Sequence, residues 1–256
     1  MQDMSLPFLV VQISDFHVGA DWADADPVAE LAAAVAAVRA LVPEPDAVIA
    51  SGDLADHAAT AEYERVAELL APLGAPVHVL PGNHDDRAAL RRGFGLAGAG
   101  AEPVHYAVDL GPLRLVMLDS MIPGQDAGAL DDDQLAWLDD VLSAAPAQPT
   151  LLAMHHPPLL TGVPAWDAIG LAGTSRRALG AVVERHPQVR RIVAGHVHRT
   201  ITGALAGRSV LTVPSTYVQG RLDFGAHELA LAREPAGFAV HAVLDGEVTS
   251  HIQPIA

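Results

Sequence analysis

The chain of 256 residues contains no cysteine and no lysine. Without cysteine there is no disulfide bond, no cysteine nucleophile and no thiolate-ligated zinc. Without lysine there is neither the lysine of a Walker phosphate loop nor a side chain that forms a Schiff base. These absences exclude several classes of enzyme before any motif is considered.

Long apolar runs are also missing. No run reaches the roughly 18 consecutive apolar residues that predict a membrane-spanning helix. The N-terminal sequence has no cationic stretch ahead of an apolar one, so it does not resemble a signal peptide. We therefore expect a soluble, cytoplasmic protein with no membrane partner.

Basic residues are scarce, since 15 arginines stand against 31 acidic residues and the net charge is −16. Nucleic-acid polymers are bound through Lys and Arg that neutralise phosphates, so we expect no nucleic-acid partner. Half of the residues are hydrophobic, enough for a sizeable core, and the length suits one large domain or two small ones. Histidine is abundant, with 13 residues, and the acidic side chains suit divalent cations.

The N-terminal part alternates strands and helices. Apolar runs at residues 8–13, 47–50 and 77–80 predict buried strands. Helical periodicity between these runs predicts two helices, which we expect to be capped by Asp26 and Thr60. This βαβαβ order is typical of a largely parallel sheet with right-handed crossovers.

Strands predominate in the rest of the chain. Helices are predicted at residues 85–92, from the acidic run 131–133, and from a cap at Thr174. Further strands are predicted at residues 106–110, 113–118, 150–154 and 189–194, and after about residue 200 at 208–213, 227–232, 238–244 and 248–252. We expect one domain, residues 1–256, with two packed sheets, outer helices and an all-strand C-terminal part.

Polar side chains follow five of the predicted strands at the point where each strand ends. They are Asp15 and His17, Asp53, Asn83 and His84, His155, and His196 and His198. Ligands bind at the carboxyl ends of strands in open α/β sheets, so we expect these side chains to lie close together. Carboxylate, imidazole and amide oxygen are ligands of Mn, Fe, Co or Zn. An ordinary turn would explain any one of these segments, but five in order predict a metal site.

This constellation resembles the calcineurin-like metallophosphoesterases. The motifs are Asp15-x-His17, Gly52-Asp53-x-x-Asp56, Gly82-Asn83-His84-Asp85, His155 and Gly195-His196-x-His198. The phrases Pro-Gly-Asn-His-Asp-Asp at residues 81–86 and Met-His-His-Pro-Pro at residues 154–158 are similar to class III cyclic-nucleotide and glycerophosphodiester phosphodiesterases. The resemblance implies a four-layer sandwich, in which two mixed β-sheets are flanked by helices.

The resemblance also implies two divalent transition-metal ions per chain. One ion would be held by Asp15, His17, Asp53 and His198, and the other by Asp53, Asn83, His155 and His196. Asp53 would bridge the ions, which would generate a hydroxide that attacks phosphorus. His84 would not be a ligand; by resemblance it binds the phosphoryl oxygen and protonates the leaving group.

Other polar and aromatic residues near the motifs have two interpretations each. Asp56 and Asp85 are expected to orient ligands, with a solvated carboxylate and a helix cap as the alternatives. His156 is expected to be structural and His57 to lie on the surface. Three aromatic residues either stack on a base or pack in the core: Phe16, Trp166 and Tyr217.

The expected activity is hydrolysis of small phosphodiesters, with 3′,5′-cyclic nucleotides first and glycerophosphodiesters next. A phosphomonoesterase or protein phosphatase on the same site is the alternative. Sites for the more highly charged monoesters usually add Lys or Arg clamps, and no Arg lies inside a ligand motif here. A non-catalytic scaffold is disfavoured because every ligand position is filled. The C-terminal strands offer sheet edges that can pair across a two-fold axis, so we expect a homodimer.

Overall fold

The first apolar run forms the strand on which one of the two sheets is built. In the computed structural model, which describes residues 6–255, β1 (Phe8–Ile13) pairs in parallel with β2 (Ala47–Ala50). β2 pairs in parallel with β3 (Val77–Val79). The crossover helices are α1 (Pro27–Arg39) and α2 (Thr60–Leu70), and α2 continues into the 3-10 turn η1 (Ala71–Leu73). The predicted βαβαβ unit is therefore confirmed.

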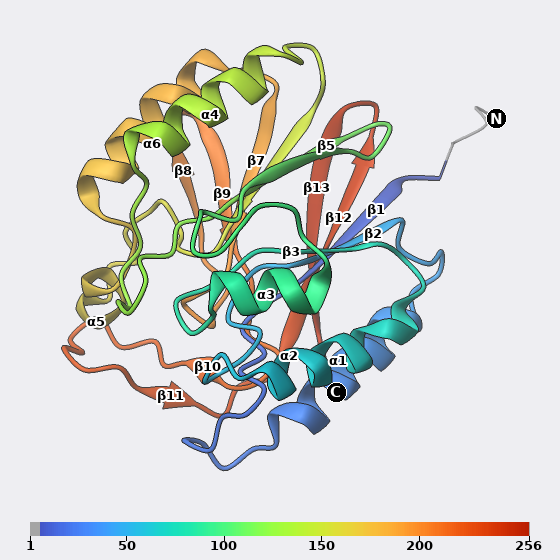
Figure 1. The fold of residues 1–256 in the computed structure, drawn as a ribbon, viewed down its shortest axis with the longest axis vertical. Helices are drawn as coiled ribbons and strands as arrows, with labels where there is room; N and C mark the ends of the chain where they lie inside the picture. Colours follow the sequence, from blue (N-terminus) through green and yellow to red (C-terminus); the bar gives the residue numbers. More distant parts are fainter. Residues whose placement is uncertain (1–5, 256) are drawn as a thin grey trace.

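The end of the chain completes the same sheet. β12 (Gly237–Leu244) pairs antiparallel with β1, and β13 (Glu247–Pro254) pairs antiparallel with β12. The strand order is β13-β12-β1-β2-β3, so the sheet is mixed. Figure 1 shows these red C-terminal strands beside the blue β1.

The second sheet has the order β4-β5-β6-β7-β9-β8. Its inner strands β5, β6, β7 and β9 are parallel, and the edge strands β4 and β8 are antiparallel to their neighbours. The strands are β4 (Tyr106–Asp109), β5 (Arg114–Leu118), β6 (Thr150–Met154), β7 (Val189–Ala194), β8 (Thr202–Leu205) and β9 (Arg208–Thr212). The expected hairpin of β4 and β5 is confirmed.

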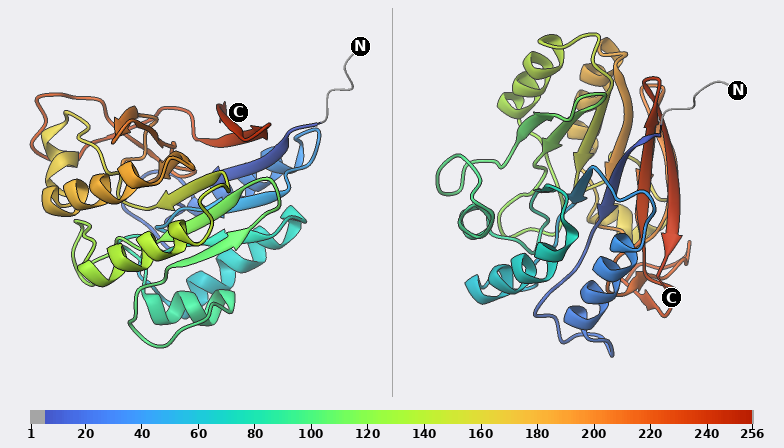
Figure 2. Two further views of the ribbon diagram at one scale, coloured as in Figure 1. Left: turned by 90° about the horizontal axis from the view of Figure 1, so that it is seen from above. Right: turned by 90° about the vertical axis from the view of Figure 1, so that its right-hand side faces the viewer.

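Helices cover the outer faces of both sheets (Figures 1 and 2). On the second sheet they are α4 (Asp132–Ser143) and α6 (Gly173–Arg185), whose leucines and valines pack against β5, β6 and β7. Successive residues of β1 alternate between two apolar layers: Val11 and Ile13 face α1 and α2, whereas Val10 faces the second sheet. The layers are therefore helix, sheet, sheet and helix, which confirms the predicted four-layer sandwich.

Several predicted boundaries are wrong by a few residues. α3 (Arg87–Phe94) is capped by Asp86, whose carboxylate accepts the Ala89 N–H, rather than starting at residue 85. α2 and α6 begin after Ala59 and Ala172 rather than at threonine caps. At α2 the Glu62 carboxylate accepts the Ala59 N–H and so replaces a side-chain cap.

The segment after β9 contains less strand than predicted. The strand expected over residues 227–232 is reduced to β11 (Leu231–Ala232), because this segment pairs only with the two residues of β10 (Gln219–Gly220). A short helix, α5 (Pro164–Ala168), interrupts the loop after β6. Within residues 6–255 no helix is long and apolar enough to cross a membrane.

Candidate metal centre

The ends of five buried strands meet at one place between the sheets. They bring together all the predicted ligands: Asp15 and His17 after β1, Asp53 after β2, Asn83 after β3, His155 after β6, and His196 and His198 after β7. All of these side chains except that of Asn83 are buried. Short apolar strands thus deliver seven polar residues to the edge of the sandwich.

One group of side chains gathers around His17. Its Nε2 atom lies 3.0 Å from His198 Nε2 and 3.6 Å from Asp53 Oδ2. His198 Nε2 lies 3.6 Å from Asp15 Oδ1. Ligand atoms at about 2.0–2.2 Å from one ion lie roughly 3–4 Å from each other. These four residues therefore have the spacing of one coordination sphere, with the members predicted for the first ion.

A second group gathers around Asn83. Its Oδ1 atom lies 3.0 Å from His196 Nδ1 and 3.2 Å from His155 Nε2. His155 Nε2 also lies 3.3 Å from Asp53 Oδ2, so that one carboxylate oxygen borders both groups. The other oxygen of Asp53 accepts the backbone N–H of His84 at 2.9 Å. Asp53 is therefore the link between the two groups, as predicted for a bridging residue.

The outer nitrogens of the four buried histidines determine what the inner nitrogens can do. Nδ1 of His17 is 2.9 Å from Asp56 Oδ1, Nδ1 of His155 is 2.8 Å from the Ser51 carbonyl, and Nδ1 of His198 is 2.7 Å from the Val218 carbonyl. Nε2 of His196 is 3.0 Å from the Ile169 carbonyl. An oxygen acceptor requires a proton on the nitrogen that faces it, so in the neutral form of each ring the opposite nitrogen carries a lone pair.

The inward-facing atoms are consequently electron-pair donors. When all four rings are neutral, the imidazole nitrogens, the carboxylate oxygens of Asp15 and Asp53, and the Asn83 amide oxygen converge at 3.0–3.6 Å with lone pairs facing one another. Such a cluster is unfavourable unless a cation lies inside it. The residues therefore fit divalent metal ions with mixed nitrogen and oxygen ligands.

The pKa values of three of these rings fit the same interpretation. Burial lowers the pKa of His17, lowers that of His198 to about 4, and lowers that of His196 well below its ordinary value. The neutral ring is the form that binds metal. Burial alone would lower the pKa of His155 too, but the charges of Asp53 and Asp15 and the hydrogen bonds to Asp53 and Ser51 together outweigh it and raise the pKa to about 9. Without a cation, a proton on His155 takes the place of positive charge beside Asp53.

His156, which we expect to be structural, lies next to this cluster, close to His155 and His196. Its Nδ1 is 2.9 Å from Ser120 Oγ and its Nε2 is 3.1 Å from the Asp126 carbonyl. Both ring nitrogens thus have hydrogen-bonding partners outside the cluster. His57, by contrast, lies on the surface and contacts Glu62.

Asp56 joins three aromatic rings beside the first group. Its Oδ1 atom lies 2.9 Å from His17 Nδ1, 3.0 Å from Trp22 Nε1 and 3.2 Å from His84 Nδ1. These hydrogen bonds outweigh the effect of burial and hold the pKa of Asp56 well below its ordinary range. Asp56 therefore contacts a candidate ligand and a candidate catalytic residue at the same time.

The carboxylates around His84 favour the protonated form of its ring. Burial alone would lower its pKa, but the hydrogen bond to Asp56 and the charge of Asp53 raise the pKa to about 10. Its Nδ1 is held by Asp56, and the ring lines the cavity above the metal cluster. A cationic donor at this place can contact a phosphoryl oxygen.

Asp85 accepts hydrogen bonds from the backbone of two loops beneath the site. Its carboxylate accepts the N–H groups of Leu54, Ala55 and Gly82 and the hydroxyl of Tyr63. It thereby ties the loop that carries Asp53 to the loop that carries Asn83. The alternative interpretation of Asp85 as a helix cap is wrong, because Asp86 caps α3.

The backbone at the site adopts conformations that side chains usually avoid. Five of the predicted ligands have positive φ: Asp15 57°, His17 49°, Asp53 51°, His196 71° and His198 47°. Left-handed backbone at residues other than glycine costs about 1–3 kcal/mol each and clusters at functional sites. The fold therefore holds these residues in strained positions from which their side chains converge.

An open cavity of about 490 Å³ lies over the cluster. It is lined by His17, Trp22, Asp53, Asn83, His84, Asp126, Trp166, Ile169, His196, His198, Leu229 and Leu231. Trp166 thus borders the cavity while it packs on Val163 and Val197, whereas Phe16 lies wholly in the core. Trp22, Asp126, Leu229 and Leu231 were not predicted, and only Trp22 follows closely on a motif.

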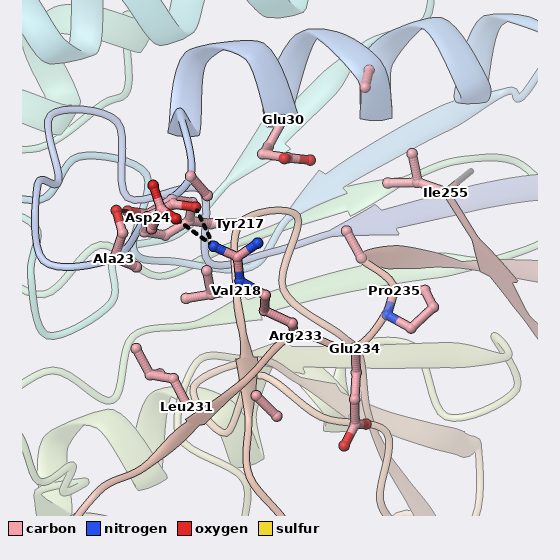
Figure 3. Close-up of a pocket in the computed structure, with 14 residues that line it drawn as sticks. Ala23, Asp24, Glu30, Tyr217, Val218, Leu231, Arg233, Glu234, Pro235 and Ile255 are labelled. Carbon is pink, nitrogen blue, oxygen red and sulfur yellow. Dashed lines mark hydrogen bonds and ion pairs between the residues drawn. The ribbon is translucent and has the colours of Figure 1, made fainter.

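A neighbouring cavity of about 720 Å³ contains none of the predicted ligands (Figure 3). It lies between α1, with the segment before it, and the segment around β11, with Asp24 and Glu30 on one side and Arg233 on the other. Tyr217 lines it and packs on Trp22, with ring centres 5.0 Å apart. Tyr217 therefore separates this cavity from the metal cluster rather than stacking on a ligand there.

Comparison with known proteins identifies the family. A family model described as calcineurin-like phosphoesterase matches residues 8–200. The chain belongs to this family. It is 35% identical over 229 residues to the 3′,5′-cyclic adenosine monophosphate phosphodiesterase CpdA of Pseudomonas aeruginosa, a match that covers 87% of this chain and 82% of that protein. The predicted resemblance to metal-dependent phosphoesterases is thereby confirmed.

Two further comparisons agree with this assignment. The chain is 32% identical over 240 residues to a probable glycerophosphodiester phosphodiesterase, GpdQ, of Arcobacter nitrofigilis, which covers 91% of this chain and 88% of that protein. The fold matches a crystal structure of a dimetal phosphatase from Danio rerio with a TM-score of 0.68 at 17% identity, over 98% of this chain and 100% of that one. Members of the calcineurin-like family use divalent metals, which fits the ligand cluster.

Proposed function

We propose that this protein hydrolyses small phosphodiesters with two divalent transition-metal ions. The observation that carries the proposal is the convergence, at 3.0–3.6 Å, of nitrogen and oxygen atoms from seven side chains that suit a metal ion: Asp15, His17, Asp53, Asn83, His155, His196 and His198. Relatives named as cyclic-nucleotide and glycerophosphodiester phosphodiesterases support the reaction class.

The two groups of side chains suggest how the ions would be divided. Asp15, His17 and His198 would hold one ion, and Asn83, His155 and His196 the other. Asp53 would serve both through Oδ2, since Oδ1 is engaged by the backbone of His84. When bound, the ions would polarise the phosphoryl oxygens and lower the pKa of a water molecule. Mn, Fe, Co and Zn all suit this donor set.

His84 would contact the substrate rather than the metal ions. Its charged ring lines the cavity, and its Nδ1 is fixed by Asp56, which leaves Nε2 free to contact a phosphoryl oxygen or to donate a proton to the leaving alkoxide. The hydrogen bond from Trp22 to the same carboxylate limits rotation of Asp56. The chain itself therefore supplies the orientation and the proton.

The charge of the cavity favours a diester over a monoester. Among the described residues that line it there is no arginine, and the sequence has no lysine. A monoester brings close to two negative charges, which phosphate sites usually match with Arg or Lys. A diester brings one. The best candidates are 3′,5′-cyclic nucleotides, with glycerophosphodiesters next.

The test compares kcat/KM for bis(p-nitrophenyl) phosphate and p-nitrophenyl phosphate in manganese, with cyclic AMP and a glycerophosphodiester alongside. We expect kcat/KM for the diester to exceed that for the monoester by about tenfold or more, which corresponds to about 1.4 kcal/mol of transition-state stabilisation. The metal content of the same preparations should approach two ions per chain. A tenfold preference for the monoester would replace the proposal with a phosphatase, and saturation at one ion would reject the two-metal site.

A further inference from the structure

Exposed apolar side chains gather at the mouth of the catalytic cavity. Trp22 is 41% exposed, Leu229 52% and Leu231 41%, yet all three line the cavity that contains His84. Large apolar side chains are usually exposed singly, and a group of them beside a polar site indicates that something apolar binds there. None of them belongs to a ligand motif.

Trp22 is held in a fixed orientation. Its indole N–H donates to Asp56 Oδ1 at 3.0 Å. Its ring packs edge-on against His17 and Tyr217, with ring centres 5.2 Å and 5.0 Å apart. A tryptophan fixed by its polar end and by two neighbours loses little entropy when an apolar group contacts its remaining surface. It is therefore a preformed wall rather than a mobile surface residue.

Leu231 comes from the C-terminal part of the chain, far from Trp22 in the sequence. It lies in β11, paired with Gly220 of β10. Arg233, just after β11, donates to the Asp24 carboxylate at 2.5 Å, and Asp24 lies in the segment that carries Trp22 (Figure 3). Leu231 also lines the neighbouring cavity, so it forms part of the wall between the two. The two segments that supply the apolar side chains are thus connected.

The polar groups that line the mouth of the cavity disfavour a substrate with a second negative charge. Apart from the candidate metal ligands and His84, the ionisable residue that lines the cavity is Asp126. A substrate whose organic group carries another phosphate or carboxylate would meet this acidic side chain and no arginine. A neutral apolar group would meet Trp22, Leu229 and Leu231, with Trp166 and Ile169 deeper in the same cavity.

We infer that Trp22, Leu229 and Leu231 form an apolar subsite for an organic group of a singly charged diester. The preferred substrates carry a flat aromatic or an alkyl group, and diesters with only small, polar organic groups are poorer substrates. This inference rests on the proposed function, because it assigns part of the same cavity. It names Leu229 and Leu231 as residues that determine specificity rather than residues that take part in the chemistry.

The test uses two anions that cannot be hydrolysed, diphenylphosphinate and dimethylphosphinate, which have the same charge and differ only in their organic groups. Isothermal titration calorimetry on the manganese-loaded protein gives the ratio of their dissociation constants. We expect diphenylphosphinate to bind at least about tenfold more tightly, the usual size of a good apolar contact. The double variant Leu229→Ser/Leu231→Ser should reduce this ratio about five- to tenfold.

Leu222→Ser is the matched control. Leu222 lies in the same connection between β10 and β11 and is 48% exposed, but it does not line the cavity. It should keep the wild-type ratio. Because the substituted leucines are half-exposed, all variants should keep the wild-type melting temperature. For bis(p-nitrophenyl) phosphate, the double variant should raise KM while kcat changes less than twofold, as expected for uniform binding.

The possible failures are distinguishable. Equal affinity for the two phosphinates, or an unchanged ratio in the double variant, overturns the subsite even if diesters are hydrolysed. An equal effect of Leu222→Ser would indicate a general surface effect and also overturn it. If the loaded protein hydrolyses no diester and binds neither phosphinate, the proposed function itself is wrong.

Discussion

A histidine that binds a metal ion uses both ring nitrogens, one toward the ion and one toward a partner that fixes the proton. Here the partners of His155, His196 and His198 are backbone carbonyls, of Ser51, Ile169 and Val218. These partners are set by the fold and survive most side-chain changes. Only the partner of His17, the Asp56 carboxylate, can be removed by substitution. Single-residue tests are therefore most informative at Asp53, Asp56 and His84.

Asp53→Ala and His84→Ala should separate metal binding from proton transfer. Asp53→Ala removes the one carboxylate that borders both groups, so the protein should lose most of its metal and its activity. His84→Ala removes no candidate ligand, so it should keep its metal and lose roughly 10²–10⁴ in kcat. Metal analysis by mass spectrometry and diester turnover measure the two effects.

Two results would contradict this division of roles. Full activity in Asp53→Ala would mean that no bridge is needed. Loss of metal in His84→Ala would mean that His84 is a ligand. Melting temperatures of both metal-free variants serve as the control, because neither substitution empties the apolar core.

At the scale of elements, the site depends on how closely the strand ends approach each other. A Cβ atom on Gly82 would lie 2.2 Å from Asp53 Oδ1, and one on Gly195 would lie 2.0 Å from Ser14 Oγ. Real Cβ atoms do not approach other atoms so closely. These glycines are therefore required by the contact between neighbouring loops rather than by their own backbone angles.

Gly82→Ala should consequently displace Asp53 and lower metal affinity by about tenfold or more, the scale found when ligand orientation is lost. Gly180→Ala is the matched control: Gly180 lies in α6, where a Cβ atom would meet Leu205 at 3.5 Å, an ordinary contact. The control should keep metal affinity and gain roughly 0.5–1 kcal/mol of stability. Titration of the metal-free proteins with manganese gives the affinities; equal affinities would show that the loops can adjust.

The sequence predicts well what depends on local pattern. The apolar runs before Asp15, Asp53 and His155 predict strands correctly, and the shared position of the polar residues after them predicts the cluster. Helix starts are wrong at α2 and α3 because neighbouring carboxylates compete for the cap.

Features that depend on distant contacts were missed. Nothing in the sequence shows that β12 pairs with β1, or that Leu231 from the C-terminal part borders the same cavity as His17. Trp22 has no motif of its own and obtains its position from Asp56. The positive φ values of the ligands likewise result from the packing of two sheets and have no signature in residue type. The residues that line the cavity were therefore less predictable from the sequence than the candidate metal ligands.

At the scale of the whole molecule, β13 is an edge strand. It pairs with β12 on one side and, among described residues 6–255, with no strand on the other. Unpaired edges offer backbone groups to a second chain. We therefore predict a homodimer in which β13 strands pair across a two-fold axis.

Multi-angle light scattering at micromolar concentration measures the mass directly. Thr249→Lys, on β13, should weaken the dimer, because lysine on an edge strand opposes pairing. Thr60→Lys, at the exposed start of α2, adds the same charge elsewhere and should not. A monomeric wild type would reject the dimer, and equal effects of the two variants would reject the edge.

A chain of polar side chains crosses the apolar layer between the sheets. Arg191 of β7 contacts Ser250 Oγ, which lies 2.6 Å from His241 Nδ1. His241 Nε2 lies 3.2 Å from Gln12 Oε1, and the Gln12 amide donates to the Ala194 carbonyl of β7 at 3.2 Å. The buried histidine at its centre makes the assembly of the two sheets sensitive to pH.

His241 is fully buried, and burial, together with the charge of Arg191, lowers its pKa from 6.5 to about 3. The unfolded chain binds a proton at this residue once the pH falls below 6.5, whereas the folded protein does not until about pH 3. The contribution of neutral His241 to stability is therefore complete above pH 6.5 and is lost as the pH falls toward 3. Between about pH 7.5 and 5 the loss amounts to about 2 kcal/mol.

His241→Gln removes this titration while it keeps a polar side chain of similar size between Ser250 and Gln12. The free energy of unfolding is measured by urea denaturation of the metal-free proteins at about pH 7.5 and about pH 5. Between these two values it should fall by about 2 kcal/mol less in the variant than in the wild type. His251→Gln, an exposed histidine of β13, makes the same change of residue but leaves His241 in place, so it should retain the full wild-type loss. If His241→Gln loses as much stability on acidification as the wild type, then the pKa of His241 is the same in the folded and the unfolded protein, and burial does not lower it.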